Sequence, residues 1–359
     1  MRILVATDAW HPQISGVVRT LESLAKAVRG LGSSIDFLTP EGFASLPLPT
    51  YPGLRCALPR PGAVARRIAL ARPDAIHIAT EGPIGFLVRR HCLKQALPFT
   101  TSFTTRFPEY IAARVPLPVD WSYAALRRFH AAAVATMVST PSLAAELTAR
   151  GFQRLRMWSR GVDNQLFRPD RARNLDLPRP IFMSVGRIAP EKNLEAFLSL
   201  PLPGSKVVIG EGPQEAELRG RFPQAHFLGS MAGEGLAAHM AAADVFVFPS
   251  RTDTFGIVQL EALSCGVPVA AYPVTGPVDV IGQSPAGILD DDLRQACLRA
   301  LELPRAACRA HALKFSWEAS AAQFLSHLRQ IAADVFETAA PLQAAWDDKA
   351  LGPLKSGAQ

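Results

Sequence analysis

The sequence predicts an α/β protein made of two doubly wound, Rossmann-like domains that face each other across a cleft. The chain has 359 residues, which suits two domains of about 100–200 residues each. Short apolar segments alternate with segments of helical period, as in parallel sheets with crossover helices. The alternation restarts near residue 180, which favours two such sheets over one.

The first unit begins with an apolar strand at 2–8 and a helix over 17–31, whose Leu21, Leu24 and Val28 share one face. A polar, Pro-bearing stretch at 164–180 separates it from the second unit. We expect domains at 1–165 and 166–335, and a partly disordered tail at 336–359. Further strands are predicted at 34–40, 74–80, 98–103, 135–141, 180–186, 205–213, 225–230, 243–250 and 267–273, and helices at 191–200 and 233–242.

The composition is that of a globular protein, with 48% hydrophobic and 19% charged residues. No apolar run approaches the roughly 18 residues of a membrane-spanning helix. The five cysteines have no C-x-x-C spacing, which argues against a disulfide framework and against a zinc site. The chain opens directly on a strand without a signal-peptide pattern, so we expect a cytoplasmic protein.

The charge of the chain is asymmetric. Residues 1–165 hold 20 Lys and Arg against 10 Asp and Glu, whereas the remainder holds 18 against 21, within a net charge of +7. The first domain is therefore expected to meet an anionic partner such as a membrane surface, and ordinary solvation of an Arg-rich face is the alternative. Nucleic acid is not expected as a partner, because no nucleic-acid-binding motif accompanies the charge.

The loops that follow strands are the candidate sites, because ligands of parallel α/β sheets bind at the carboxyl ends of the strands. The loop HPQISGVVRT (11–20) places Gly16 at a helix N-terminus that suits an anion, but it is no G-x-G-x-x-G dinucleotide fingerprint. In SVGRIAPEKN (184–193), Gly186 is followed by Arg187 and Lys192, two cations that suit a diphosphate. The turn GEGP (210–213) is equally explained as structural.

The segment PSRTDTFGIVQLEALSCG (249–266) carries two acids eight positions apart, Asp253 and Glu261. Phe255-Gly256 begins a predicted helix that ends at Gly266. Glu261 lies on this helix. Asp253 lies just before it, where it suits either a helix cap or the binding of a polyhydroxyl ligand.

Taken together, these segments resemble the retaining GT-B glycosyltransferases of the fourth family. PSRTDTFGIVQLEALSCGVPVAA is similar to the family's E-x7-E region. SGVVRTL, RGVDNQLFRPD (160–170), VGRIAPEKNL (185–194) and FSW (315–317) match further family segments in the right order. The matches cover most of residues 1–330. They imply the GT-B fold, an acceptor-side N-terminal domain, a donor-binding C-terminal domain, and a C-terminal helix that crosses back to the first domain.

The resemblance implies a nucleotide-sugar donor, either a UDP-hexose or GDP-mannose, and no metal cofactor. Arg187 and Lys192 would hold the departing diphosphate and Asp253 the sugar hydroxyls, which makes these three the catalytic candidates. Glu261 would bind the ribose hydroxyls. The other donor-binding candidates are Gly16, Gly186, Thr254, Phe255 and Gly256.

The chain departs from the family pattern at two places. The first acid is usually Glu, whereas Asp253 is one methylene shorter. The family often has a His in the segment matching TSFTTRFPEY (101–110), where this chain has Thr104. A strand histidine such as His77 is more typical of a core. The acceptor-side candidates are His11, Thr104, Thr105 and Arg106.

Two Arg-rich segments of the first domain, 57–73 and 111–130, mix cations with apolar residues as a membrane-interface surface does. We therefore expect an enzyme peripheral at the inner membrane that glycosylates a membrane glycolipid or a diacylglycerol. A soluble or polysaccharide acceptor is one alternative, and a non-catalytic nucleotide-sugar-binding protein on the same fold is another. The second segment contains Arg114, Trp121, Tyr123, Leu126, Arg127, Arg128 and Phe129.

Overall fold

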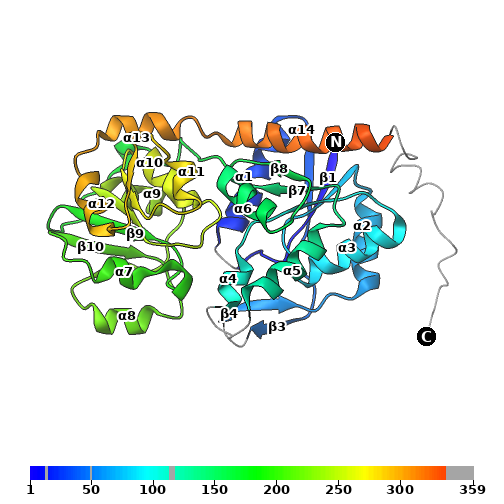
Figure 1. The fold of residues 1–359 in the computed structure, drawn as a ribbon, viewed down its shortest axis with the longest axis horizontal. Coiled ribbons are helices and arrows are strands. Elements are labelled where there is room, and N and C mark those ends of the chain that lie inside the picture. The colour runs from blue at the N-terminus through cyan, green and yellow to red at the C-terminus, as the bar shows by residue number, and fades with distance from the viewer. Residues whose placement is uncertain (13–14, 49–50, 113–117, 337–359) are drawn as a thin grey trace.

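The structure, a computed structural model, describes residues 1–12, 15–48, 51–112 and 118–336. They form two lobes, each built on a six-stranded parallel sheet (Figure 1), so the predicted fold class is confirmed. The first domain contains β1 Arg2–Ala6, β2 Ser34–Leu38, β5 Ala75–Ile78, β6 Thr100–Ser102, β7 Ala135–Val138 and β8 Leu155–Met157, in the order β2-β1-β5-β6-β7-β8. The second contains β9 Ile181–Val185, β10 Ser205–Ile209, β11 His226–Phe227, β12 Val245–Phe248, β13 Val269–Ala271 and β14 Gly287–Leu289, in the order β11-β10-β9-β12-β13-β14.

Helices connect the strands and cover both faces of each sheet. The first-domain helices are α1 Gly16–Gly30, α2 Pro61–Ala71, α3 Pro83–Gln95, α4 Phe107–Ala112, α5 Val119–His130 and α6 Pro141–Ala149. The second part of the chain adds η1 Pro169–Arg171, η2 Pro190–Lys192, α7 Leu194–Leu198, α8 Glu215–Arg221, α9 Gly233–Ala242, α10 Ile257–Ser264, α11 Pro277–Val280, α12 Leu293–Ala300, α13 Arg305–Ala312 and α14 Trp317–Phe336. Because strand side chains alternate, Ile3 and Val5 of β1 share a core with α1 and α14, while Leu4 and Ala6 share one with α2 and α3.

The last helix, α14, packs on the first domain although the chain reaches it from the second (Figure 1). Phe324 and Leu328 are buried in the core that also holds residues of α1. The Trp158 indole N–H donates to the Ser320 hydroxyl over 3.1 Å, and His327 Nε2 lies 2.7 Å from the Met157 carbonyl oxygen. Of the predicted tail at 336–359, everything after Phe336 lies outside the described residues.

Several elements differ from the sequence-based expectation. An unpredicted antiparallel hairpin, β3 Ser45–Leu48 and β4 Tyr51–Ala57, carries prolines at positions that argue against strands. The predicted helix over 191–200 is divided into η2 and α7, because Asn193 takes a left-handed conformation with φ 50°. The strand expected at 225–230 is reduced to the two residues of β11.

Candidate active site

The site lies at the carboxyl edge of the second sheet, where β9 and β12 are neighbours and the strand order reverses. The loop after β9 and the loop after β12 are joined by hydrogen bonds. The Asn193 side-chain amide donates to the Pro249 carbonyl over 3.0 Å, and the Ser250 hydroxyl donates to the Glu191 carbonyl over 3.0 Å. The two loops that carry the predicted cations and the first predicted acid therefore form one unit.

Lys192 and Asp253 form an ion pair between these two loops. The Lys192 ammonium lies 2.6 and 2.8 Å from the two carboxylate oxygens of Asp253. Burial opposes the charge on the ammonium, but Asp253 and the nearby Tyr110 and Glu191 outweigh it and raise the pKa of Lys192. Asp253 makes no cap to α10, so the helix-cap alternative is not realised.

Arg187 follows Gly186 at the end of β9, and its guanidinium lies 4.0 Å from the carboxylate of Glu191. The turn after β10 packs directly beneath it: a Cβ on Gly210 would stand 1.9 Å from the Gly186 carbonyl oxygen. A glycine is therefore needed at this close approach, which gives the GEGP turn a structural task. The turn after β10 therefore packs against the loop after β9, which carries Arg187 and Lys192.

Helix α10 carries the second predicted acid. Gly256 precedes the helix with φ 77°, a left-handed conformation that favours glycine, and Phe255 beside it is buried. Glu261, on the second turn, is only 4% exposed. Burial raises the pKa of the Glu261 carboxyl and the Arg19 guanidinium lowers it, and the net effect is an increase. Its Oε2 atom is buried without a hydrogen-bond partner.

The first domain reaches this carboxylate through α1. The Arg19 guanidinium donates to Oε1 of Glu261, which is 242 positions away in sequence. A Cβ on Gly16, the first residue of α1, would lie 3.9 Å from Ile257, the first residue of α10. The N-terminal ends of α1 and α10 therefore meet, as the predicted roles of Gly16 and Gly256 require.

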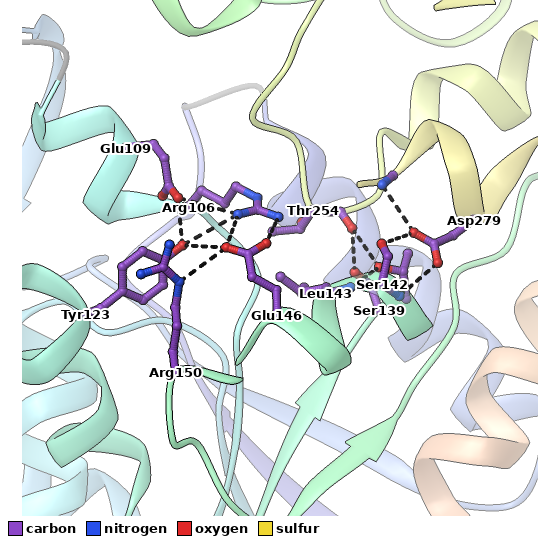
Figure 2. A network of polar contacts seen from close by, with 12 residues as sticks. Arg106, Glu109, Tyr123, Ser139, Ser142, Leu143, Glu146, Arg150, Thr254 and Asp279 are labelled. Atoms are coloured by element: carbon purple, nitrogen blue, oxygen red, sulfur yellow. Dashed lines mark hydrogen bonds and ion pairs between the residues drawn. The ribbon is translucent and has the colours of Figure 1, made fainter. Parts of the chain in front are cut away.

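Thr254 ties the Asp253 loop to the first domain (Figure 2). Its hydroxyl donates to the Thr104 carbonyl over 2.8 Å. Its own carbonyl accepts a hydrogen bond from the Ser139 hydroxyl over 3.0 Å, as Figure 2 shows. Thr104, which stands where the family often has a His, donates weakly to the Ala79 carbonyl over 3.3 Å. The predicted acceptor-side residue Thr104 thus adjoins the predicted donor-binding residue Thr254.

The Arg106 guanidinium is engaged in a buried network (Figure 2), which corrects its assignment as a group available to an acceptor. It donates to the two Glu146 oxygens over 2.9 and 2.6 Å. The Tyr123 hydroxyl donates to Glu109 over 2.6 Å beside it. Burial opposes the charge on Arg106, yet Glu146 raises its pKa, so the side chain supports the turn that follows Thr105.

The two histidines named from the sequence have different surroundings. His11 is exposed, with Nε2 2.6 Å from a Glu22 oxygen, and its acceptor role stays a prediction. His77 is fully buried, and its two ring nitrogens lie 2.8 Å from the Thr100 hydroxyl and 2.6 Å from the Ser102 hydroxyl. Burial lowers the pKa of His77 to about 3, so it is a neutral core residue, as the strand pattern indicated.

Two residues of the site, Arg19 and Tyr110, were not predicted from the sequence. Tyr110, on α4 of the first domain, lies close enough to the cation loop for its hydroxyl to interact with Lys192 and Asp253. Burial raises the pKa of Tyr110 to about 12, with Lys192 opposing and Asp253 adding to the effect. The only signal in the sequence is its place at the end of TSFTTRFPEY, after a strand.

Comparisons with known families agree with this geometry. The family described as Glycosyltransferase Family 4 matches residues 14–166, and the family described as Glycosyl transferases group 1 matches residues 179–302. The first match ends before the second sheet begins, so each domain has its own counterpart. The chain belongs to the family 4 glycosyltransferases of the GT-B fold.

Relatives of this glycosyltransferase are named as transferases, some of them as GDP-mannose-dependent. It is 30% identical over 76% of its length to the sulfoquinovosyl transferase SQD2 of Arabidopsis thaliana, of which the match spans 60%. It is 28% identical over 80% of its length to a GDP-mannose-dependent alpha-mannosyltransferase of Mycobacterium tuberculosis, of which the match spans 83%. The matched stretch is thus under two thirds of the plant protein and most of the bacterial one.

Solved structures show the same fold. A sucrose-phosphate synthase from Thermosynechococcus elongatus superposes with a TM-score of 0.76 at 22% identity, over 93% of this glycosyltransferase and 99% of that chain. HepE of Anabaena, in complex with UDP and glucose, superposes with a TM-score of 0.68 at 15% identity, over 92% and 100% of the two chains. At these identities the likeness establishes the two-domain architecture.

The predicted membrane surface of the glycosyltransferase needs a correction. Tyr123 and Phe129 on α5 are 3% and 2% exposed, because they pack into the first-domain core. Trp121, by contrast, is 71% exposed, and Phe107 and Ile111 on the neighbouring α4 are partly exposed. Around the second Arg-rich segment the exposed apolar groups therefore lie at the start of α5 and along α4, and in the first Arg-rich segment Leu58 and Leu70 are exposed. Arg114, which the prediction included, lies outside the described residues.

Neither a membrane span nor a metal cluster appears in the described ranges. No helix there is long and apolar enough to cross a bilayer. No group of three or more His, Cys, Asp or Glu side chains in those ranges is arranged to hold a metal ion.

Proposed function

We propose that this glycosyltransferase moves a hexosyl group, with retention of configuration, from a UDP-hexose or GDP-mannose to a hydroxyl acceptor. The observation that carries the proposal is the state of Glu261, a buried carboxylate whose Oε2 lacks a partner. Buried polar atoms are nearly always hydrogen-bonded, so an orphaned oxygen where the two domains meet argues for a missing ligand. A ribose hydroxyl supplies the donor that this oxygen lacks.

Different charged groups bind different parts of the donor. The diphosphate lies against Arg187 and Lys192, a bidentate fork and a point charge that stabilise it as the leaving group. Asp253, held by Lys192 and adjacent to Thr254, accepts hydrogen bonds from sugar hydroxyls. Gly16 leaves room for the donor to approach the backbone at the N-terminus of α1. Gly256, with φ 77°, lets the backbone turn into α10 beside it.

In the transfer step the bond between the anomeric carbon and the diphosphate oxygen breaks, and a bond from the acceptor oxygen to that carbon forms on the same face. The acceptor proton passes to the leaving phosphate oxygen, so no side chain is needed as the base. The name of the mannosyltransferase relatives favours GDP-mannose, and the fold shared with HepE, solved with UDP and glucose, keeps a UDP-hexose open.

A donor screen tests the proposal. Thermal unfolding is followed with UDP-, GDP- and ADP-sugars, and release of the nucleoside diphosphate is measured with the donor that stabilises most. A ligand at 100 times its dissociation constant adds about 2.7 kcal/mol to the free energy of unfolding. Turnover that disappears in Glu261→Ala supports the proposal. Stabilisation without any turnover supports a non-catalytic nucleotide-sugar-binding protein, and no stabilisation by any donor contradicts both.

For the acceptor we propose a lipid, a glycolipid or diacylglycerol, reached by an enzyme that is cytoplasmic and peripheral at the inner membrane. The support is the excess of basic residues in the first domain together with exposed Trp121, Phe107 and Ile111. Flotation with vesicles of neutral and anionic lipid tests it. Binding at low salt that weakens at high salt and in Trp121→Ala is expected; absence of binding points to a soluble or polysaccharide acceptor.

A further inference from the structure

Arg19 occupies an unusual place, because it belongs to the first domain but completes the donor site of the second. It lies in the first turn of α1, three residues after Gly16. Its guanidinium donates to Oε1 of Glu261, and its side chain remains 30% exposed while that of Glu261 is 5% exposed. The two helices that carry this pair meet at their N-terminal ends.

A buried carboxylate is costly unless a cation pairs with it. Within the described part of the second domain, the cations beside α10 are engaged elsewhere. Arg305 donates to the carbonyls of Ala243 and Ala241, and Arg309 donates to carbonyls that include that of Asn164. Arg19 is the group that forms an ion pair with Glu261, so the charge of this acid depends on the other domain.

The ion pair also places the two carboxylate oxygens of Glu261 in different environments. Oε1 is occupied by Arg19, while Oε2 is buried without a partner. A carboxylate held at one oxygen cannot rotate freely, so the second oxygen keeps a fixed direction. Oε2 of Glu261 is therefore oriented to accept one hydrogen bond from a ligand hydroxyl.

We propose that Arg19 is a positioning residue for donor recognition: it keeps Glu261 ionised and oriented so that Oε2 accepts a ribose hydroxyl. The inference rests on the proposed function, since the ribose belongs to the nucleotide-sugar donor. It adds that the ribose is recognised only when both domains meet, because the cation comes from α1 and the acid from α10. Selection for a ribonucleotide then depends on the contact between α1 and α10.

Calorimetric titration of the full chain with UDP and GDP, and with their 2′-deoxy and 3′-deoxy forms, tests the inference. The quantity measured is the ratio of the dissociation constants of the deoxy and ribo forms. A hydrogen bond to a charged acceptor makes this ratio about ten or more in the wild type. In Arg19→Met the ratio should fall to about one for the hydroxyl that Oε2 binds, while Arg19→Lys, which keeps the charge, should keep part of it.

Arg29→Met is the matched control, because Arg29 lies on the same helix but is exposed in its last turn. It should bind as the wild type does. In a Glu261→Gln background, Arg19→Met should change the ratio no further. A folded Arg19→Met variant that keeps the wild-type ratio, or that weakens ribo and deoxy forms equally, overturns the inference alone. A wild type that binds neither nucleotide overturns the proposed function, and the inference falls with it.

Discussion

The Lys192 ammonium contacts both carboxylate oxygens of Asp253, at 2.6 and 2.8 Å, across two loops that follow adjacent strands of the second sheet. The pair lies where the strand order of that sheet reverses, which is where ligands of doubly wound sheets bind. A nucleotide sugar offers a phosphate that can bind the cation and a sugar hydroxyl that can bind the acid. In the proposed function, the pair marks the junction between the diphosphate and the sugar.

Asp253→Asn is expected to reduce turnover by about 100-fold or more without weakening the binding of UDP or GDP. The carboxylate is assigned to the sugar, so the nucleotide alone does not use it, and its loss frees Lys192 for the diphosphate. Initial rates and calorimetric titration measure the two effects. The control is Asp291→Asn, at an exposed acid of the same domain. Equal losses in nucleotide affinity and turnover would contradict the assignment.

Glu261→Gln is expected to stabilise the free protein at pH 7–8 while abolishing selection for the ribose. Burial raises the pKa of Glu261 above its ordinary value of 4.5, so ionised Glu261 is less favourable in the folded than in the unfolded chain. The stability of the wild type is full below 4.5 and declines as the pH rises through the folded pKa. Thermal unfolding from pH 4 to 8 should show the gain of the variant growing with pH. Glu318→Gln, at an exposed acid, should show no such trend.

Arg106→Met should lower the free energy of unfolding by about 2 kcal/mol, because the partly exposed Glu109 and Glu146 lose the buried cation that they share and only Arg150 remains beside Glu146. Arg106 is 6% exposed and donates to both oxygens of Glu146. Urea unfolding measures the loss. The double variant Arg106→Met with Glu146→Gln should recover part of it, since both charges are then gone. A double variant that loses the sum of the two single effects would speak against a paired network.

Asp279→Ala should loosen the contact between the domains as well as lower stability. Asp279, on α11 of the second domain, accepts from the backbone N–H of Ser142 over 2.9 Å and from its hydroxyl, so it caps α6 of the first domain (Figure 2). Loss of a cap costs about 1 kcal/mol. X-ray scattering of the free protein should show a larger radius of gyration.

The control for this variant is Asp292→Ala, which removes a cap inside the second domain. Asp292 accepts from the backbone N–H of Arg294 over 2.9 Å and of Gln295 over 3.2 Å. It should cost similar stability and leave the radius of gyration unchanged. If both variants leave the radius unchanged, the Asp279 contact does not hold the domains together.

The sequence predicted those features of the fold that depend on local pattern. The apolar segments at 2–8 and 243–250 contain β1 and β12. The strand and helix alternation that restarts near residue 180 corresponds to the second sheet. Short elements without such a pattern were missed. The three residues of β8 are partly or fully exposed, and those of β14 are half-buried, so neither reads as a buried strand.

The site was predictable where a residue follows a strand, and unpredictable where it depends on the other domain. Lys192 and Asp253 could be named from their loops, but their contact required the adjacency of β9 and β12. The pairing of Arg19 with Glu261 joins residues 242 positions apart. It depends on how two separately folded sheets meet, which no local spacing encodes.

The most direct test of the account is proton NMR of the transfer reaction with the donor selected by the screen. The anomeric proton of the donor and that of the product are followed together in the wild type and in Asp253→Asn. The wild type is expected to consume the donor and form a product of the same anomeric configuration, and Asp253→Asn is expected to do so at least about 100-fold more slowly. A product of inverted configuration, or an Asp253→Asn variant as fast as the wild type, would contradict it.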